Sequence, residues 1–170
     1  MASSTNSMKE IRIAKVTLNV GAGKNEELLK KGLKLLQKLS PQTPVKTMAK
    51  RRIPAWGLRP GLTIGCKVTI RKEAETLLKR LLAAKGMALL AKNFDQQGNF
   101  SFGVPEYIDI TGLEYDPELK IIGLEAAVTL ERPGFRVKKR RLHLVPVGKK
   151  QRISQEEAIA FVKGLGVEVR

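Results

Sequence analysis

Hydrophobic and polar residues alternate along three segments of the chain, residues 11–20, 62–71 and 122–130. Strict alternation is typical of a β-strand with one buried and one exposed face. In the first segment the apolar residues change phase near Ala14 and Lys15, which predicts a β-bulge or a late strand start. A further short strand is predicted at residues 107–110, inside a segment that is otherwise rich in turns.

A hydrophobic period of about 3.6 residues predicts three amphipathic helices. The first follows Asn25, a residue type that caps helices, and the second covers residues 73–84. The third begins at Ser154, which forms a capping-box pattern with Glu157. Strands interspersed with helices predict an α+β fold. We expect an antiparallel or mixed sheet with helices packed on one face and an exposed face on the other.

A chain of 170 residues is long enough to bury a core, so we expect one domain over residues 1–170. Residues 1–8 are small and polar and are expected to form a disordered tail. The 42% content of hydrophobic residues excludes a purely disordered basic protein. There is no run of about 18 apolar residues, so no membrane span is predicted. The N-terminus has no secretory signal pattern, and we expect a cytoplasmic protein.

Charge changes this picture, because the chain has 32 Lys plus Arg against 16 Asp plus Glu. The formal net charge is +16 and the pI is about 10.2. Such a charge indicates a nucleic-acid-binding protein. The cations gather in two acid-free blocks, and residues 93–131 between them hold eight acids and one cation. A generally solvated cationic surface is the alternative interpretation, but it does not account for acid-free blocks.

The first block, residues 42–72, has eight Lys or Arg and no acid. Its two ends have strand patterns, but its middle contains Pro54, Gly57, Pro60 and Gly61, which interrupt regular structure. We therefore predict a basic loop (residues 50–61) that projects from the sheet edge. The second block has nine Lys or Arg and no acid, and it predicts an extended basic arm (residues 132–152).

The outward positions of the first and third predicted strands carry short polar or cationic side chains, namely Thr17, Asn19, Thr63, Lys67, Thr69 and Arg71. If these strands are neighbours, they form a polar surface that can follow a ribose-phosphate backbone and reach hydroxyls and base edges. An ordinary solvent-exposed sheet face is the alternative. Neither strand has a carboxylate on its outward side, which favours RNA.

No set of residues in the sequence indicates catalysis, a metal or a cofactor. The turn Gly21-Ala22-Gly23-Lys24 lies between a strand and a helix but lacks both the GxGxxG and the GxxxxGK[ST] spacing. One cysteine and one histidine exclude an internal disulfide and a Cys/His zinc site. Two competing hypotheses remain, a nucleotide-using enzyme with the Gly21–Lys24 turn as its phosphate site and a free RNA chaperone.

Three sequence segments resemble one known family: LNVGAG at residues 18–23, PQTPVKTMAKRRIPAWGLRPGLTIGCKVTIRK at 41–72 and NFDQQGNFSFGVPEYIDITGLEYDPE at 93–118. They are similar to the large-subunit ribosomal protein five family, which is numbered eleven in eukaryotes. The basic stretch from residue 131 to 161 resembles the archaeal and eukaryotic branch, and the short length favours an archaeal source.

The resemblance implies a structural constituent of the large ribosomal (50S) subunit. Such a protein binds 5S rRNA in the central protuberance through its exposed sheet face, beside neighbouring ribosomal proteins and large-subunit rRNA. The family's rRNA-recognition positions fall on Asn19, Gln42 and Thr69. We expect rRNA contacts also from Thr17, Thr63, Lys67 and Arg71, and from the arm residues Arg136, Lys138, Lys139, Arg140 and Arg141.

The resemblance also implies that the basic loop contacts peptidyl-site tRNA. The residues that match this part of the family are Lys50, Arg51, Arg52, Trp56 and Arg59. We expect the cations to supply most of this contact. Trp56 is expected to pack at the base of the loop rather than to stack on a nucleic-acid base, because an exposed indole is costly without a partner.

Overall fold

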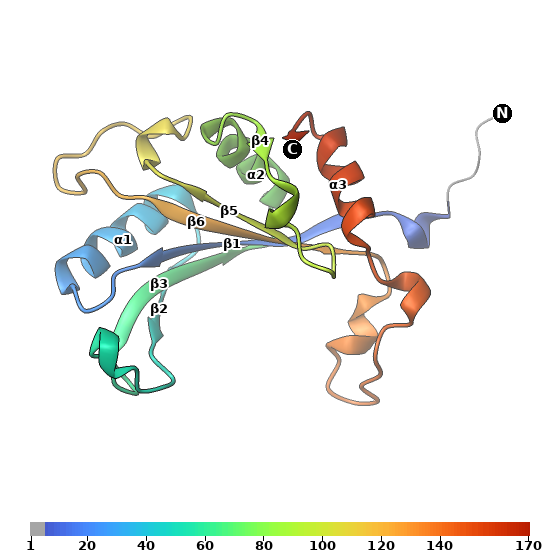
Figure 1. Ribbon diagram of the computed structural model, residues 1–170, viewed down its shortest axis with the longest axis horizontal. Coiled ribbons are helices and arrows are strands. Elements are labelled where there is room, and N and C mark those ends of the chain that lie inside the picture. Colours follow the sequence, from blue (N-terminus) through green and yellow to red (C-terminus); the bar gives the residue numbers. More distant parts are fainter. Residues whose placement is uncertain (1–5) are drawn as a thin grey trace.

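A computed structural model describes residues 6–170 and contains a five-stranded antiparallel sheet with the strand order β2-β3-β1-β6-β5 (Figure 1). Its strands are β1 (Arg12–Gly21), β2 (Val45–Met48), β3 (Thr63–Ile70), β5 (Phe100–Val104) and β6 (Leu124–Glu131). Helices α1 (Glu26–Leu39), α2 (Ala74–Ala84) and α3 (Gln155–Gly164) complete the predicted α+β fold. The fold class predicted from the sequence is confirmed.

Strand β1 lies at the centre of the sheet and pairs with β3 on one side and β6 on the other. The register places Leu18 of β1 opposite Val68 and Ala126, all of them buried. A register shift between Ile13 and Lys15 confirms the predicted bulge. Because side chains alternate along a strand, the bulge brings the residues from Val16 onward into one consistent apolar face.

Helix α1 packs against β1 and β3 and begins where the sequence predicts. The Asn25 side chain accepts hydrogen bonds from the backbone N–H groups of Glu27 and Leu28, which satisfies two free donors of the first turn. Gly32 faces the sheet, and a Cβ at this position would lie 3.0 Å from both Cys66 Sγ and Val20 Cγ1. The glycine therefore allows the helix to lie close to the strands.

Three elements differ from the sequence prediction. The predicted strand at 107–110 is wrong, because Tyr107–Asp109 form a 3-10 turn that buries Tyr107 and Ile110. The strand of this region is β5, which pairs with β6. Strands β4 (Ala88–Leu89) and β7 (Glu168–Val169) form a small parallel sheet that the sequence analysis did not predict.

The basic arm is not uniformly extended, so that prediction is also wrong. It contains 3-10 turns at Phe135–Lys138 and Lys149–Gln151, and Gly134 enters the first with a positive φ of 93°. The N-terminal prediction concerned residues 1–8, of which residues 1–5 lie outside the described part of the chain. Residues Ser7–Lys9 form a 3-10 turn capped by Asn6, partly within the segment expected to be disordered.

Arg132 anchors the base of the arm to the rest of the molecule. Its side chain is 8% exposed, and its guanidinium donates to the Lys9 carbonyl at 3.0 Å and to the Arg152 carbonyl at 3.2 Å. It also forms an ion pair with Glu157 of α3 at 2.8 Å. Arg132 thus joins the N-terminal segment, both ends of the arm and α3, and it is not available for RNA.

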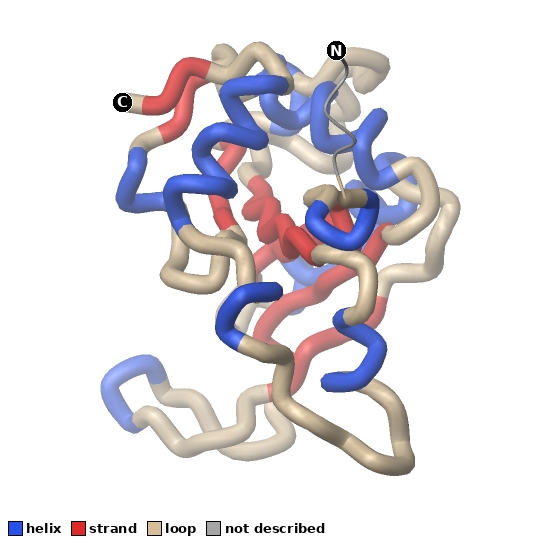
Figure 2. The backbone as a smooth tube through the Cα atoms, turned by 90° about the vertical axis from the view of Figure 1, so that its right-hand side faces the viewer, coloured by secondary structure: helices blue, strands red, loops and turns tan. Residues whose placement is uncertain are grey.

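The basic loop and the basic arm project on the same side of the molecule, away from α2 and α3 (Figures 1 and 2). The loop joins β2 to β3 near the end of β1, whereas the arm follows β6 near the start of β1. Since β1 has ten residues, its ends are about 30 Å apart at about 3.3 Å per residue. In the described residues no helix is long and apolar enough to cross a membrane.

Glu157 generates a prediction about acid stability. Its pKa is held below the usual value of 4.5, first by the backbone N–H of Ser154 and then by Arg132. A carboxyl group with a lowered pKa stabilises the fold above about pH 4.5, and this contribution is lost as the pH falls through its folded-state pKa. We expect Glu157→Gln to lower the free energy of unfolding by about 1 kcal/mol at pH 7. The difference from the wild type should shrink below pH 4.5 in urea unfolding experiments.

Glu156→Gln is the matched control, because it neutralises a carboxylate of the same helical turn that has no hydrogen-bond partner among the described residues. A stability difference for Glu157→Gln that stays constant from pH 7 to pH 3.5 would contradict the assignment.

Candidate nucleic-acid interface

Four hydrogen-bonding side chains lie next to one another on the face of the sheet that α1 does not cover. The antiparallel register of β1 and β3 places Thr17 opposite Thr69 and Asn19 opposite Lys67. Lys67 is exposed and the other three are partly exposed. The polar surface expected from the sequence required these two strands to be neighbours in the sheet, and they are. We call this surface the polar sheet face.

The other predicted rRNA-contacting residues of the sheet region lie around this group. Thr63 begins β3, and Arg71 follows its end and is exposed. Gln42 precedes β2 and is exposed, and its backbone N–H donates to the Ser40 hydroxyl at 3.1 Å. Strand β2 pairs with β3 at the sheet edge, where the exposed Val45 lies opposite Lys67, so the polar surface ends beside an apolar residue there.

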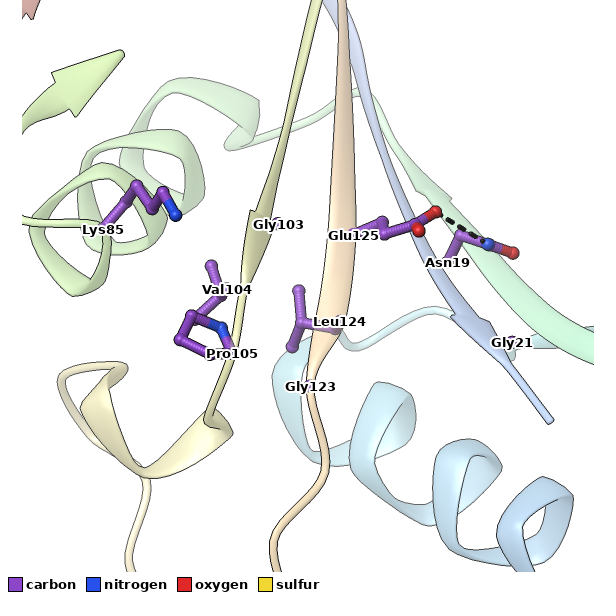
Figure 3. A pocket seen from close by; sticks show the side chains of 9 residues that line it. All are labelled: Asn19, Gly21, Lys85, Gly103, Val104, Pro105, Gly123, Leu124 and Glu125. Atoms are coloured by element: carbon purple, nitrogen blue, oxygen red, sulfur yellow. Dashed lines mark hydrogen bonds between the residues drawn. The ribbon is translucent and has the colours of Figure 1, made fainter. Parts of the chain in front are cut away.

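The polar sheet face contains a carboxylate that the sequence analysis did not place there. Strand β6 brings Glu125 opposite Asn19, and Asn19 Nδ2 donates to Glu125 Oε2 at 3.3 Å (Figure 3). The absence of acids from the outward sides of β1 and β3 is correct, but it does not extend to the whole face. Alternation in residues 122–130 predicts that Glu125 points outward. That Glu125 lies beside Asn19 depends on the order of the strands in the sheet, which the alternation does not give.

The basic loop has a defined backbone structure. Its base is closed by hydrogen bonds from Ala49 N to the Leu62 carbonyl at 2.8 Å and from Gly61 N to the Ala49 carbonyl at 3.0 Å. Above the base, Ile53 and Leu58 form a β-bridge around a 3-10 turn at Pro54–Trp56. Its predicted RNA-contacting cations Lys50, Arg51, Arg52 and Arg59 are exposed and have no ion pair among the described residues.

Trp56 does not pack at the base of the loop, so that prediction is wrong. Its side chain is 69% exposed, whereas Leu58 is buried in the position that the indole was expected to fill. The reason lies in the turn, since Gly57 adopts a positive φ of 60° and returns the chain so that Leu58 pairs with Ile53. The indole is left at the tip, beside the cations.

Lys24 adds a further cation to the basic loop. From the sequence, this lysine was considered only as part of a nucleotide site. A Cβ on Gly57 would lie 2.0 Å from Lys24 Nζ, so the lysine crosses the loop at this glycine. The backbone N–H groups of Ala22 and Gly23 both donate to the Ile64 carbonyl, at 2.9 and 3.0 Å. These two donors are therefore not available to a phosphate, which argues against a nucleotide site in this turn.

The cations of the basic arm are exposed but not equally free. Lys139 forms an ion pair with Glu131, and Arg140 Nε donates to the His143 carbonyl at 2.7 Å. Arg136, Lys138 and Arg141 have no side-chain hydrogen bond or ion pair within residues 6–170. These three can bind an anion without first losing an internal side-chain contact, and so can Lys149 and Lys150 near the end of the arm.

Acidic residues of the middle segment neutralise cations of α1. Lys34 pairs with Glu118, whose hydrogen bond and charge raise the lysine's pKa. Lys38 pairs with Asp116, and the hydrogen bond from Lys38 is the first cause of that carboxyl group's lowered pKa. These two ion pairs lower the positive charge of α1, whereas the cations of the loop and most of those of the arm keep theirs unpaired among the described residues. No group of three or more potential metal ligands occurs among the described residues.

An exposed polar sheet face with two cationic projections is typical of an RNA-binding protein, and comparison with known families defines the class as ribosomal. Residues 6–59 match the family described as "Ribosomal protein L5", and residues 63–165 match the model for the C-terminus of the same ribosomal family. The chain therefore belongs to the ribosomal protein L5 family.

Similar proteins from archaea support this membership. The chain is 50% identical to "Large ribosomal subunit protein uL5" of Nanoarchaeum equitans, over 95% of this chain and 97% of that protein. It is 48% identical to the protein of that name from Sulfurisphaera tokodaii, over 93% and 90%. The Methanococcus vannielii protein of that name is 46% identical, over 95% and 92%.

The family and the archaeal type inferred from the sequence are confirmed. The family is one of structural proteins of the large ribosomal subunit and not of enzymes. The expected location, the large subunit of the cytoplasmic ribosome, follows from this membership.

Proposed function

We propose that this protein binds 5S rRNA with its polar sheet face, contacts large-subunit rRNA with the basic arm and reaches peptidyl-site tRNA with the basic loop. The observation that supports the first part is the register of β1 and β3, which groups Thr17, Asn19, Lys67 and Thr69 on one exposed surface. The expected place in the central protuberance, beside neighbouring ribosomal proteins, belongs to the same proposal.

The chemistry of the polar sheet face suits RNA. Threonine hydroxyls both donate and accept hydrogen bonds, as does the 2′-hydroxyl that distinguishes RNA from DNA. Asn19 can contact a hydroxyl or a base edge, and Lys67 can contact a phosphate. The short side chains lie on strands, so little conformational entropy is lost when they bind.

The loop and the arm are suited to different RNA partners because they lie near opposite ends of β1. Pro54 and Pro60 restrict the loop backbone, which lowers the cost of ordering it on a ligand. With 69% of its side chain exposed, Trp56 can stack on a base, and this replaces the packing role expected from the sequence. A free RNA chaperone remains the second candidate, and it would bind unrelated RNAs as tightly as 5S rRNA.

The polar sheet face is tested by the double variant Asn19→Ala/Thr69→Ala. We expect its affinity for 5S rRNA to fall by about 1 kcal/mol or more for each lost hydrogen bond, with little change in thermal stability. Fluorescence anisotropy with labelled 5S rRNA measures the first, and circular dichroism melting measures the second. Thr76→Ala/Thr111→Ala is the control, since both threonines are exposed outside the sheet. Unchanged affinity in a folded double variant would exclude this face.

The arm is tested through the salt dependence of rRNA binding. Neutralising Arg136, Lys138 and Arg141 to glutamine should reduce the slope of log affinity against log salt concentration by about 2 to 3, because each phosphate contact contributes roughly 0.7 to 0.9. Lys139→Gln should change it by less than about 1, since Glu131 already pairs with this lysine. A slope equal to that of the wild type in the triple variant would mean that the arm does not contact phosphates.

The loop is tested by neutralising Arg51, Arg52 and Arg59. Binding to 5S rRNA and incorporation into the subunit should remain nearly intact, while tRNA occupancy of the peptidyl site should fall, most clearly at raised salt. The triple variant of the arm described above should instead weaken rRNA binding and leave tRNA occupancy of the peptidyl site in assembled subunits nearly unchanged. If the loop variant fails to bind 5S rRNA and holds tRNA normally once assembled, the loop belongs to the 5S rRNA interface instead.

A further inference from the structure

A groove crosses the polar sheet face between β1 and the segment that follows α2. It consists of two adjoining hollows of about 460 and 550 Å³, both lined by Asn19, Lys85, Gly103 and Glu125. These volumes lie in the range of small-molecule sites, about 300 to 1,000 Å³. Figure 3 shows Lys85 on one side of the groove and the Asn19–Glu125 pair on the other, with β5 and β6 between them.

The middle of the groove lies over small residues. The outward positions of β5 and β6 beside Glu125 hold Ser101, Gly103 and Ala127, and Gly123 precedes β6. A Cβ on Gly103 would meet no atom within 4 Å, so its outward side is open space. A planar group can therefore lie close to the strands between the two polar walls.

Glu125 makes this part of the face unsuitable for phosphate. An ionised carboxylate accepts hydrogen bonds and repels other anions. No Lys or Arg forms an ion pair with Glu125 among residues 6–170, so its charge is not neutralised from within the protein. A ligand that contacts Glu125 must supply N–H or O–H donors.

The hydrogen bond to Glu125 also fixes the orientation of the Asn19 side-chain amide. Because a carboxylate cannot donate, Asn19 must turn its NH₂ group toward Glu125, which leaves Asn19 Oδ1 free to accept. The amide nitrogen of Asn19 lies between Oδ1 and the carboxylate, so the two neighbouring acceptors are the two oxygens of Glu125, whose side chain the hydrogen bond from Asn19 holds in place (Figure 3). Among the four bases of RNA, only guanine has two adjacent donors, N1–H and N2–H₂, on its Watson–Crick edge. Adenine has one donor beside one acceptor, cytosine has one donor beside two acceptors, and uracil has one donor between two acceptors.

We propose that this groove binds an unpaired guanine of the RNA, read by the carboxylate of Glu125 while Asn19 holds that carboxylate in place. The base must be unpaired because its Watson–Crick edge is occupied in a duplex, and proteins read RNA sequence mainly in such single-stranded positions. The exposed ammonium group of Lys85 lies on the opposite wall, where it can contact a phosphate of the same strand. This inference rests on the proposed binding of 5S rRNA and makes Glu125 a specificity-determining residue of that site.

The sign of the effect of Glu125→Gln on affinity tests the inference. If Glu125 only repelled phosphates, neutralising it would tighten binding. If it reads guanine, the variant loses a charged acceptor and presents an NH₂ group to the base donors, and affinity for 5S rRNA should fall about tenfold or more. Glu114→Gln is the control, because it makes the same change in net charge at an exposed position outside the sheet. It should leave affinity within about twofold.

Chemical probing with kethoxal, which modifies N1 and N2 of unpaired guanine, identifies the base. The wild-type protein should protect one guanine of 5S rRNA, and Glu125→Gln should not protect it. Replacing that guanine with inosine, which lacks the N2 amino group, should weaken binding of the wild type about tenfold and that of Glu125→Gln much less. The RNA change leaves the protein intact, so misfolding of a variant cannot produce this result.

The outcomes separate this inference from the proposed function. If the wild type does not bind 5S rRNA in preference to unrelated RNA, the proposed function fails. If the wild type binds 5S rRNA but Glu125→Gln binds it equally or more tightly, or no guanine is protected, the guanine site is wrong while 5S rRNA binding stands.

Discussion

The register of β1 with its two neighbours is the constraint on which the rest of the structure depends. Val16, Leu18 and Val20 lie in the core, so Thr17 and Asn19 must lie on the opposite face. A slip of one residue would exchange the two faces along the whole strand, and burial of polar groups would oppose it. The apolar face that holds α1 and α2 thus also fixes the arrangement of the polar sheet face.

Charge is distributed so that internal pairing and RNA binding use different cations. Acids of the middle segment neutralise Lys34 and Lys38 on α1, and Glu157 and Glu131 pair with cations at the base of the arm. The cations of the loop tip and most of those of the arm have no such partner among the described residues. With a net charge of +16, the folded protein repels itself, and an anionic ligand at these positions relieves that repulsion.

Much of the fold was predictable because its signals are local. Alternation located β1, β3 and β6, and capping residues located the starts of α1 and α3. The 3-10 turn at Tyr107 was mistaken for a strand because a short apolar segment has no period that separates the two. Strands β4 and β7 were missed because each has two residues and is defined by a partner distant in sequence.

The site was predictable only in part, because some of its contacts join residues that are distant in sequence. The outward residues of β1 and β3 could be read from the sequence, whereas the contact of Asn19 with Glu125 depends on strand order. Lys24 and Lys85 reach the loop and the groove from turns next to helices, and no periodic pattern marks such positions. Trp56 was misplaced because the path of a loop backbone, here set by Gly57, decides which apolar side chain turns inward.

Methyl NMR of the threonine residues, with and without 5S rRNA, tests the central claim most directly. Thr17 and Thr69 belong to the polar sheet face, whereas Thr76 on α2 and Thr111 in a turn are exposed elsewhere and serve as internal references. Binding through the polar sheet face should shift or broaden the methyl signals of Thr17 and Thr69 and leave those of Thr76 and Thr111 unchanged. Perturbation of Thr76 or Thr111 without change at Thr17 and Thr69 would show that RNA binds another surface and would contradict the account.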